Sequence, residues 1–126
     1  MNFDCVQVDK KGRMYMAHHR PWTPLEKIQL LQRWILVTSF AYYQLDENIV
    51  PDYRYDANAH QLVDLMNQYP GDAKLSRYRD YFYDYTGETG YHLIGRVEEK
   101  DSEMYRRIWI DALWALDLKH KRGWPS

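Results

Sequence analysis

The sequence has 126 residues, and its 17 Lys and Arg residues nearly balance its 18 Asp and Glu residues, for a formal net charge of −1. This length favours one domain spanning residues 1–126 and excludes an enzyme that carries several modules on one chain. The near-neutral charge gives no general attraction to nucleic acid or to anionic membranes. The single cysteine excludes an internal disulfide framework and a cysteine-based zinc site. Twelve tyrosines stand out, and such half-polar rings suit grooves and stacking sites.

The first twenty residues are expected to form a small β-hairpin and a connector. Two short segments, FDCVQV and RMYMA, flank DKKG, and Gly12 ends this turn. The start of the chain lacks the apolar core of a signal peptide, and no segment approaches the roughly 20 apolar residues of a membrane span. We therefore expect a cytoplasmic protein that does not associate with a membrane.

A long helix is predicted over residues 24–45. Thr23, Pro24 and Glu26 form a capping-box pattern at its start. Apolar or aromatic residues then recur at helical spacing, at Ile28, Leu31, Ile35, Tyr42 and Leu45.

A second helix is predicted after a short loop, with Asp52 as its N-cap and its end before Pro70. Two helices joined by so short a loop pack as an antiparallel hairpin, here over residues 24–70. One face of the second helix carries Tyr55, Ala59, Leu62, Met66 and Tyr69.

The remaining residues, 72–126, are predicted to hold an aromatic segment and a C-terminal helix. After the TGETG turn, residues 91–97 are expected to be extended or irregular. Residues 75–85 favour a short helix before that turn, with one side formed by Tyr78, Phe82 and Tyr85.

The C-terminal helix is predicted to begin with Ser102 as its cap and to end near Lys121. Its large apolar residues are expected in the core, and an exposed remainder would indicate a dimer surface; they include Trp109, Leu113, Trp114 and Leu116. The expected fold class is mainly α, with a helical hairpin, a C-terminal helix and a small N-terminal β-hairpin.

Residues 42–70 carry the most specific pattern in the chain. They read YYQLDENIVPDYRYDANAHQLVDLMNQYP and contain the spacing Y-Y-x-L-D-x5-D-x2-Y-D. This pattern resembles the amino-terminal Ia domain of NAD-dependent DNA ligases, and the preceding helix from Leu25 extends the resemblance. In those ligases the Ia domain is a helical hairpin that recognises the nicotinamide mononucleotide (NMN) half of NAD.

The resemblance implies that the nicotinamide nucleotide contacts are Tyr42, Tyr43, Asp52, Tyr55 and Asp56. The chemistry of these side chains agrees, because tyrosine faces can stack on a cationic nicotinamide ring and a nearby carboxylate favours its charge. Carboxylates also accept hydrogen bonds from ribose hydroxyls. An alternative interpretation is structural, with Asp52 capping a helix, Asp46 ending one, and the tyrosines packed between helices.

Two further interpretations concern anions and metals. His19 or Arg20, near the start of the first helix, is a candidate contact for a ligand phosphate, because helix N-termini favour anions. The scattered histidines and the lack of a cysteine partner argue against a metal site. In residues 78–85 acids cancel bases, which argues against a site for single-stranded nucleic acid.

The chain also departs from the ligase pattern. It contains no K-x-D-G motif, whose lysine takes the adenylyl group in ligases, so we do not expect ligase activity from this chain alone. Tyr53-Arg54 and Ala57-Asn58 replace residues that are usual in the family. An isolated hairpin of this kind resembles the short ligase-related proteins of phages and prophages.

Three hypotheses for function follow. The leading one is a small protein that binds NAD, NMN or a derivative and requires no cofactor. The second is an interaction module that reuses the hairpin to inhibit or adapt a host protein. The third is a hydrolase of the nicotinamide–ribose bond, in which Asp52 or Asp56 stabilises the cationic transition state and the opposing acid is nominated only by residue type, as Glu88 or Glu47.

Overall fold

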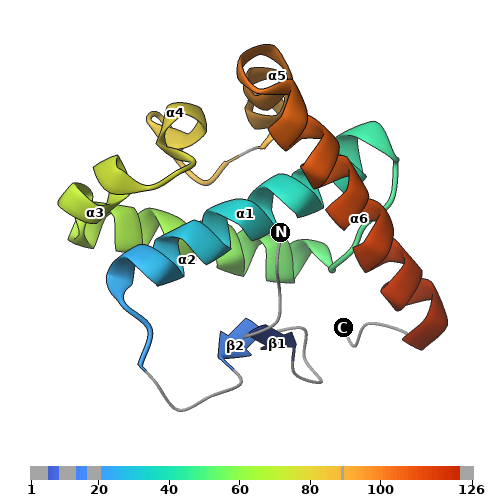
Figure 1. Ribbon diagram of the computed structural model, residues 1–126. Coiled ribbons are helices and arrows are strands. Elements are labelled where there is room, and N and C mark those ends of the chain that lie inside the picture. Colours follow the sequence, from blue (N-terminus) through green and yellow to red (C-terminus); the bar gives the residue numbers. More distant parts are fainter. Residues whose placement is uncertain (1–5, 9–13, 17–20, 89, 123–126) are drawn as a thin grey trace.

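The computed structural model describes residues 6–8, 14–16, 21–88 and 90–122. These ranges are mainly helical, as predicted (Figure 1). None of the helices in these ranges is long and apolar enough to cross a membrane. The elements in chain order are β1 (Val6–Val8), β2 (Met14–Met16), α1 (Pro24–Gln44), α2 (Asp52–Gln68), α3 (Pro70–Leu75), α4 (Arg79–Phe82), α5 (Tyr91–Lys100) and α6 (Ser102–Arg122).

The two strands have three residues each and pair in an antiparallel arrangement, with Val6 opposite Met16. The predicted turn at Gly12 and the connector through residue 20 lie outside the described residues. Two such short strands do not establish the β-hairpin predicted over residues 1–20, which therefore stays a prediction.

Helix α1 begins and ends as its sequence predicts. The Glu26 backbone N–H donates to Thr23 Oγ1 at 3.2 Å, and the Thr23 backbone N–H donates to Glu26 Oε1 at 3.0 Å. This reciprocal capping box satisfies two donors that the helix itself leaves unpaired. At the other end Leu45 is the C-cap, and Asp46 has a φ of 54°, a left-handed conformation that aspartate tolerates and that does not continue a helix.

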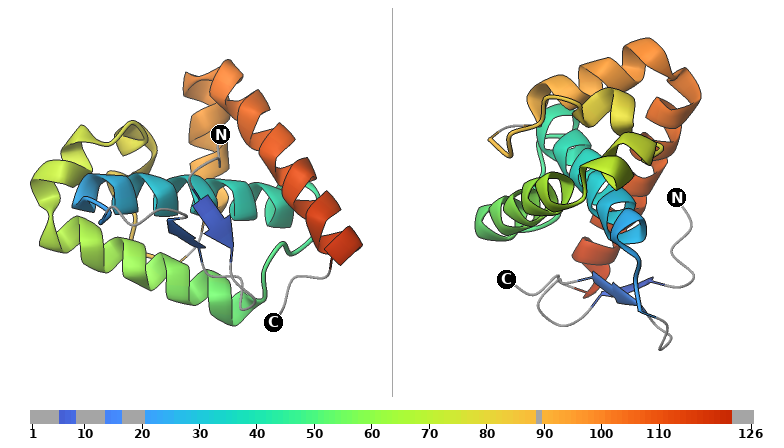
Figure 2. Two further views of the ribbon diagram at one scale, coloured as in Figure 1. Left: turned by 60° about the horizontal axis from the view of Figure 1, so that its bottom comes forward. Right: turned by 90° about the vertical axis from the view of Figure 1, so that its left-hand side faces the viewer.

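Helix α1 is the centre of the fold. Every side chain in residues 31–41 is buried, because α2 packs along one side of α1 while α3, α5 and α6 cover other sides (Figures 1 and 2). The predicted antiparallel pairing of the first two helices is present, and α6 crosses α1 near its C-terminal half (Figure 2). A helix buried all round is typical of a core element rather than of an amphipathic surface helix.

Helix α2 corrects one prediction about its cap. Pro51 is the N-cap and Asp52 is the first helical residue, without a side-chain capping bond. The extended backbone of Pro51 (φ −62°, ψ 156°) already provides the geometry before the helix. Asp52 instead complements the positive end of the helix dipole. The helix ends before Pro70, and the predicted face packs into or against the core, through Tyr55, Ala59, Leu62, Met66 and Tyr69.

The segment between α2 and α6 is more helical than its sequence predicts. The predicted helix over residues 75–85 is reduced to α4, and the three aromatic residues predicted to share one side of it are all buried. Residues 91–97, expected to be extended, lie in α5, so that prediction was wrong. The preceding TGETG turn suggested that the irregular structure continued, but the apolar spacing is helical, and α5 buries Leu93, Ile94 and Val97.

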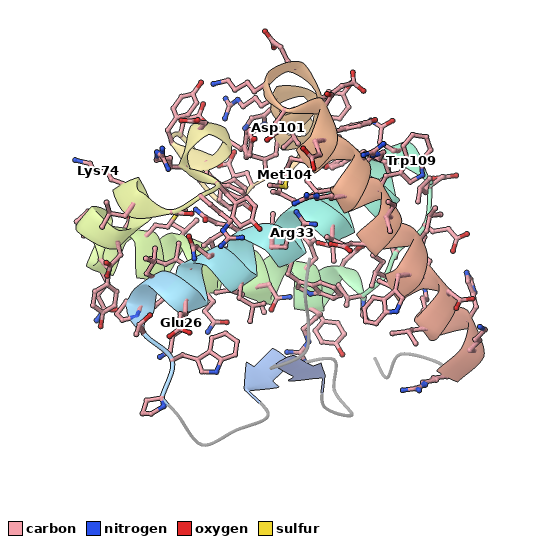
Figure 3. The ribbon with its side chains drawn as sticks, in the orientation of Figure 1. Glu26, Arg33, Lys74, Asp101, Met104 and Trp109 are labelled. Carbon is pink, nitrogen blue, oxygen red and sulfur yellow. The ribbon has the colours of Figure 1, made fainter. Side chains whose placement is uncertain are left out.

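Helix α6 corrects two further predictions. The cap is Asp101 rather than Ser102, because the Met104 backbone N–H donates to Asp101 Oδ1 at 3.0 Å; Figure 3 shows Asp101 and Met104 at the start of the helix. The helix also leaves apolar side chains at the surface instead of in the core. The exposed fractions are 44% for Trp109, 51% for Leu113 and 47% for Trp114, whereas Leu116 is buried.

A buried ion pair holds α6 against α1. The Arg33 guanidinium donates to Asp111 Oδ2 from Nη2 at 2.5 Å and from Nε at 3.2 Å. Its Nη1 also lies 2.8 Å from Met104 Sδ, and Figure 3 shows Arg33 below the start of α6. Because both charged side chains are almost fully removed from water, each depends on the other for its stabilisation.

Candidate functional site

The five residues that the resemblance nominates line one pocket. Its volume is about 240 Å³, and it lies where the end of α1, residues 45–51 and the first turns of α2 meet. The lining residues are Thr38, Tyr42, Tyr43, Asn48, Ile49, Val50, Asp52, Tyr55, Asp56 and Glu88. The structural alternative, in which the tyrosines would only pack between helices, does not describe Tyr42, which is 51% exposed.

The last turns of α1 supply an aromatic wall. The rings of Tyr42 and Tyr43 meet edge to face, with centroids 4.8 Å apart. Tyr43 also meets Tyr91 of α5 edge to face at 5.3 Å. Edge-to-face contacts of this kind stabilise ring orientation, so the wall is held in place from a helix outside the hairpin.

The first turns of α2 supply two carboxylates. Asp52 and Asp56 are four residues apart and therefore lie on the same side of the helix. Both are exposed. Together with the tyrosine rings they form a surface suited to a positively charged ring or to hydroxyl donors.

A hydroxyl pair joins Tyr55, which lines the pocket, to Ser39 of α1. The Tyr55 hydroxyl and Ser39 Oγ are 2.9 Å apart and share a hydrogen bond. Gly90 lies directly behind this pair, because a Cβ built on it would fall 2.2 Å from Ser39 Oγ and 2.6 Å from the Tyr55 hydroxyl. The position of the Tyr55 side chain thus depends on the absence of a side chain at residue 90.

Two tyrosines at this position, Tyr55 of the pocket lining and the nearby Tyr85, have raised pKa values. Burial raises the pKa of Tyr55 above the ordinary tyrosine value, although its hydrogen bond to Ser39 opposes the shift. Burial also raises the pKa of Tyr85, and the neighbouring Tyr55 adds to the increase. Among the described lining residues, the charges of the pocket are those of its carboxylates, Asp52, Asp56 and Glu88.

The sequence did not identify Glu88 as part of this site except by residue type. Glu88 lies in the TGETG turn and directly follows Gly87, which has a φ of +87°. A Cβ on Gly87 would lie 3.3 Å from Val63 Cγ2, so the turn is close to α2. The sequence signal that could have placed Glu88 near the site was the pair Gly87 and Gly90, because glycines allow a turn to pack closely against a helix.

The loop that lines the pocket is tied to the end of α6. The Lys119 ammonium donates to the backbone carbonyl of Asn48. His120 Nε2 lies 2.9 Å from Glu47 Oε2. Basic residues at the end of α6 complement the helix dipole, and two of them also contact this loop.

Other predicted or candidate features lie elsewhere. His19 and Arg20, nominated for a phosphate contact, lie outside the described residues. Over the part of the chain that the structure describes, no group of three or more His, Cys, Asp or Glu residues is arranged to hold a metal ion. A second pocket of about 270 Å³ includes Lys74 and Arg79 but none of the five nominated residues.

The fold and the site together define a class of protein: an antiparallel helical hairpin with a tyrosine- and aspartate-lined pocket at its closed end. Residues 22–75 match the family described as "DNA ligase-like, N-terminal NAD+-binding domain". This match supports the Ia domain that the motif of this segment predicts. The match covers less than half of the chain and ends before α4, α5 and α6. No curated protein and no solved structure matches the chain.

Proposed function

We propose that this protein binds the nicotinamide–ribose part of NAD, NMN or a related molecule in the pocket between α1 and α2. The observation that carries the proposal is the convergence of the five motif residues, from two helices, on one pocket. The matched family is an NAD⁺-binding domain, which supports the same ligand class.

The volume of the pocket supports one half of a dinucleotide rather than a whole one. At about 240 Å³ it lies below the roughly 300–1,000 Å³ of pockets that enclose drug-sized ligands. In the proposed mode the rings of Tyr42 and Tyr43 contact the nicotinamide ring. Asp52 and Asp56 accept hydrogen bonds from ribose hydroxyls, and the Tyr55 hydroxyl provides a neutral polar contact.

Calorimetric titration of the full chain with NMN, NAD⁺ and ADP-ribose tests this proposal. We expect heat from NMN and NAD⁺ and none from ADP-ribose, because ADP-ribose lacks the nicotinamide ring. Asp56→Asn is expected to weaken binding, whereas Asp64→Asn, on the same helix but outside the pocket, is a matched control. The absence of heat with all three ligands at millimolar concentration would overturn the proposal.

The hydrolase alternative has one observation in its favour, since Glu88 lines the same pocket as Asp52 and Asp56. Incubation of the protein with NAD⁺, followed by measurement of released nicotinamide, tests it directly. We expect no release above that of the uncatalysed reaction. Nicotinamide release that is lost in the Glu88→Gln variant would show that the protein cleaves NAD⁺. The hydrolase alternative would then replace the binding proposal.

The interaction-module alternative is favoured by a different surface, the exposed apolar residues of α6. Ile110 and Leu113 are more than half exposed, and such groups on one helix are a common feature of protein interfaces. A double variant, Ile110→Ser with Leu113→Ser, would abolish a protein contact made there while leaving nucleotide binding intact.

A phage-encoded protein of this kind could sequester an NAD-derived molecule or regulate an NAD-dependent host enzyme.

A further inference from the structure

We infer that the outward face of α6 pairs with the same face of a second copy of this chain, with the two helices antiparallel about a two-fold axis. This inference goes beyond the proposed function, because it concerns a surface outside the nicotinamide pocket and does not depend on a ligand. The residues that define the outward face are exposed and lie along one side of the helix. They are Glu103, Arg106, Ile110, Leu113, Asp117 and Lys121.

The centre of this outward face is apolar. Helix α6 lies at the edge of the molecule (Figures 1 and 2) and packs against α1 and α5 through its opposite side, where Ile108, Ala112 and Ala115 are buried. Ile110 is 57% exposed and Leu113 is 51% exposed. Because these two residues are three positions apart on a helix, their side chains adjoin. Apolar groups that gather on an exposed face mark an interaction surface.

Charged residues flank the apolar centre on both sides. Glu103 and Arg106 lie before it, and Asp117 and Lys121 lie after it. Arg106 makes no ion pair with another residue that the structure describes, whereas Asp117 contacts Lys121 of its own helix at 3.0 Å. An apolar centre with a polar rim is the arrangement found in protein–protein interfaces. The order of the charges then indicates which partner fits.

An antiparallel pair of these helices matches charges of opposite sign. When Ile110 of one copy faces Leu113 of the other, residues at equal separations before and after this centre also face each other. Arg106 is four residues before Ile110, and Asp117 is four residues after Leu113. The guanidinium of one copy therefore faces the carboxylate of the other. The two-fold axis makes this contact occur twice.

The ends of the two helices match in the same way. Glu103 is seven residues before Ile110, and His120 and Lys121 are seven and eight residues after Leu113. The acidic start of one helix therefore faces the basic end of the other. A parallel pair would instead place every charge opposite its own copy, so that like charges repel. The outward face is complementary to itself in the antiparallel orientation, which favours a second copy over an unrelated protein.

The size of the contact indicates a weak dimer. A standard stable interface takes roughly 20–30 residues from each partner. One face of α6, a helix of 21 residues, supplies fewer than that. We therefore expect a dimer that dissociates on dilution.

Sedimentation equilibrium of the full-length protein tests self-association, at concentrations from about 5 µM to about 500 µM that bracket micromolar dissociation constants. We expect the mass of one chain, 15.3 kDa, at the lowest concentration and a shift toward twice that mass at the highest. The mass of a single chain over the whole range would overturn the inference and leave the outward face to the interaction-module alternative.

Reversal of single charges tests the antiparallel register. Arg106→Asp places two acids opposite each other in the pair, and Asp117→Arg places two bases opposite each other. Each variant should raise the dissociation constant of the dimer at least about tenfold. Asp64→Arg, at an exposed position of α2, makes the same charge change outside the face and should leave the dissociation constant unchanged. Circular dichroism of the variants confirms that the fold is retained.

An equimolar mixture of the Arg106→Asp and Asp117→Arg variants tests whether the partner is a second copy. In a mixed dimer each reversed charge again faces a charge of opposite sign. The mixture should therefore associate about as tightly as the parent protein, although neither variant does so alone.

The outcomes decide the inference without reference to the pocket. Association of either single variant at the strength of the parent protein would overturn the antiparallel pairing, because a parallel pair already opposes like charges at both positions. Failure of the mixture to associate would also overturn it. Nicotinamide binding is measured separately by titration with NMN, so the proposed function can fail or hold independently.

Discussion

The close contact between Gly90 and the Ser39–Tyr55 pair makes residue 90 a sensitive position behind the pocket. The φ of Gly90 is −100°, which other residues also adopt, so the requirement for glycine comes from space rather than from backbone conformation. A methyl group there would have to displace Ser39 Oγ and the Tyr55 hydroxyl. Such overpacking changes both the stability of the fold and the position of Tyr55 in the pocket lining.

Gly90→Ala should therefore lower the free energy of unfolding by about 1–3 kcal/mol, as measured by urea denaturation. Gly95 offers a matched control, because a Cβ there meets nothing within 4 Å and the residue lies inside α5. Gly95→Ala should raise stability by about 0.5–1 kcal/mol, since alanine favours a helix over glycine. Equal effects of the two substitutions would contradict the contact at Gly90.

The buried hydroxyl of Tyr85 links stability to alkaline pH. Its pKa is raised in the folded protein, chiefly by burial, so the folded state keeps a proton that the unfolded chain loses near pH 10. Stability is therefore full below about pH 10 and falls as the pH rises above it, by up to about 1.4 kcal/mol per pH unit for one such proton. Tyr55 contributes in the same direction.

Urea denaturation between pH 8 and pH 11 checks this expectation with two variants. Tyr85→Phe should reduce the loss of stability at high pH, because it removes the ionisable group. Tyr83→Phe changes a tyrosine that is 71% exposed and should leave the pH profile close to that of the parent protein. Identical profiles for the parent and Tyr85→Phe would show that Tyr85 does not carry the effect.

At the scale of elements, α6 is attached to the hairpin through a buried pair and a loop contact. Arg33 and Asp111 join the middle of α1 to the middle of α6. Lys119 and His120 join the end of α6 to residues 47 and 48 of the pocket loop. The same helix therefore stabilises both the core and one edge of the site.

Asp111→Asn should lower the free energy of unfolding by about 3–5 kcal/mol, because it leaves the Arg33 charge buried without its counterion. Asp117 of the same helix pairs with Lys121 at the surface, at 3.0 Å, and Asp117→Asn should cost less than about 0.5 kcal/mol. Chemical denaturation of the two variants gives the comparison. A loss below about 1 kcal/mol in Asp111→Asn, which is the value of an exposed pair, would mean that the Arg33–Asp111 pair is solvated.

The elements also show how far sequence patterns could predict this fold. The capping box and apolar spacing predicted α1 well, because both signals are local. Helix α5 was missed because the glycines of the TGETG turn suggested irregular structure, whereas the burial of Leu93, Ile94 and Val97 stabilises the helix. The exposed face of α6 could not be predicted, because its apolar spacing does not reveal which partner helices cover it.

The same difference between local signals and tertiary contacts applies to the candidate site. Tyr42, Tyr43, Asp52, Tyr55 and Asp56 lie within fifteen residues of one another, so a local motif could nominate them. Glu88 reaches the pocket through the packing of a distant turn against α2, which local patterns do not encode. The contact of Lys119 with the Asn48 carbonyl likewise depends on tertiary structure.

For the whole molecule, the hairpin depends on the rest of the chain. The rings of Tyr105 and Trp109 in α6 contact Phe40 of α1, at 5.4 Å and 5.7 Å between centroids. A fragment limited to residues 22–75 would expose this face of α1 and the charge of Arg33. We expect the fragment to lose cooperative thermal unfolding, monitored by circular dichroism, while the full chain retains it. A fragment that unfolds as cooperatively as the full chain would show that the hairpin folds independently.

The central claim is that the pocket between α1 and α2 binds the nicotinamide–ribose group. Titration of ¹⁵N-labelled protein with nicotinamide riboside and then with NMN, followed by amide chemical shifts, tests it most directly. The claim predicts shifts that concentrate in residues 38–56 and at Glu88 with at least one of the two ligands. Shifts that gather instead around Lys74 and Arg79, or spectra that neither ligand changes, would contradict it.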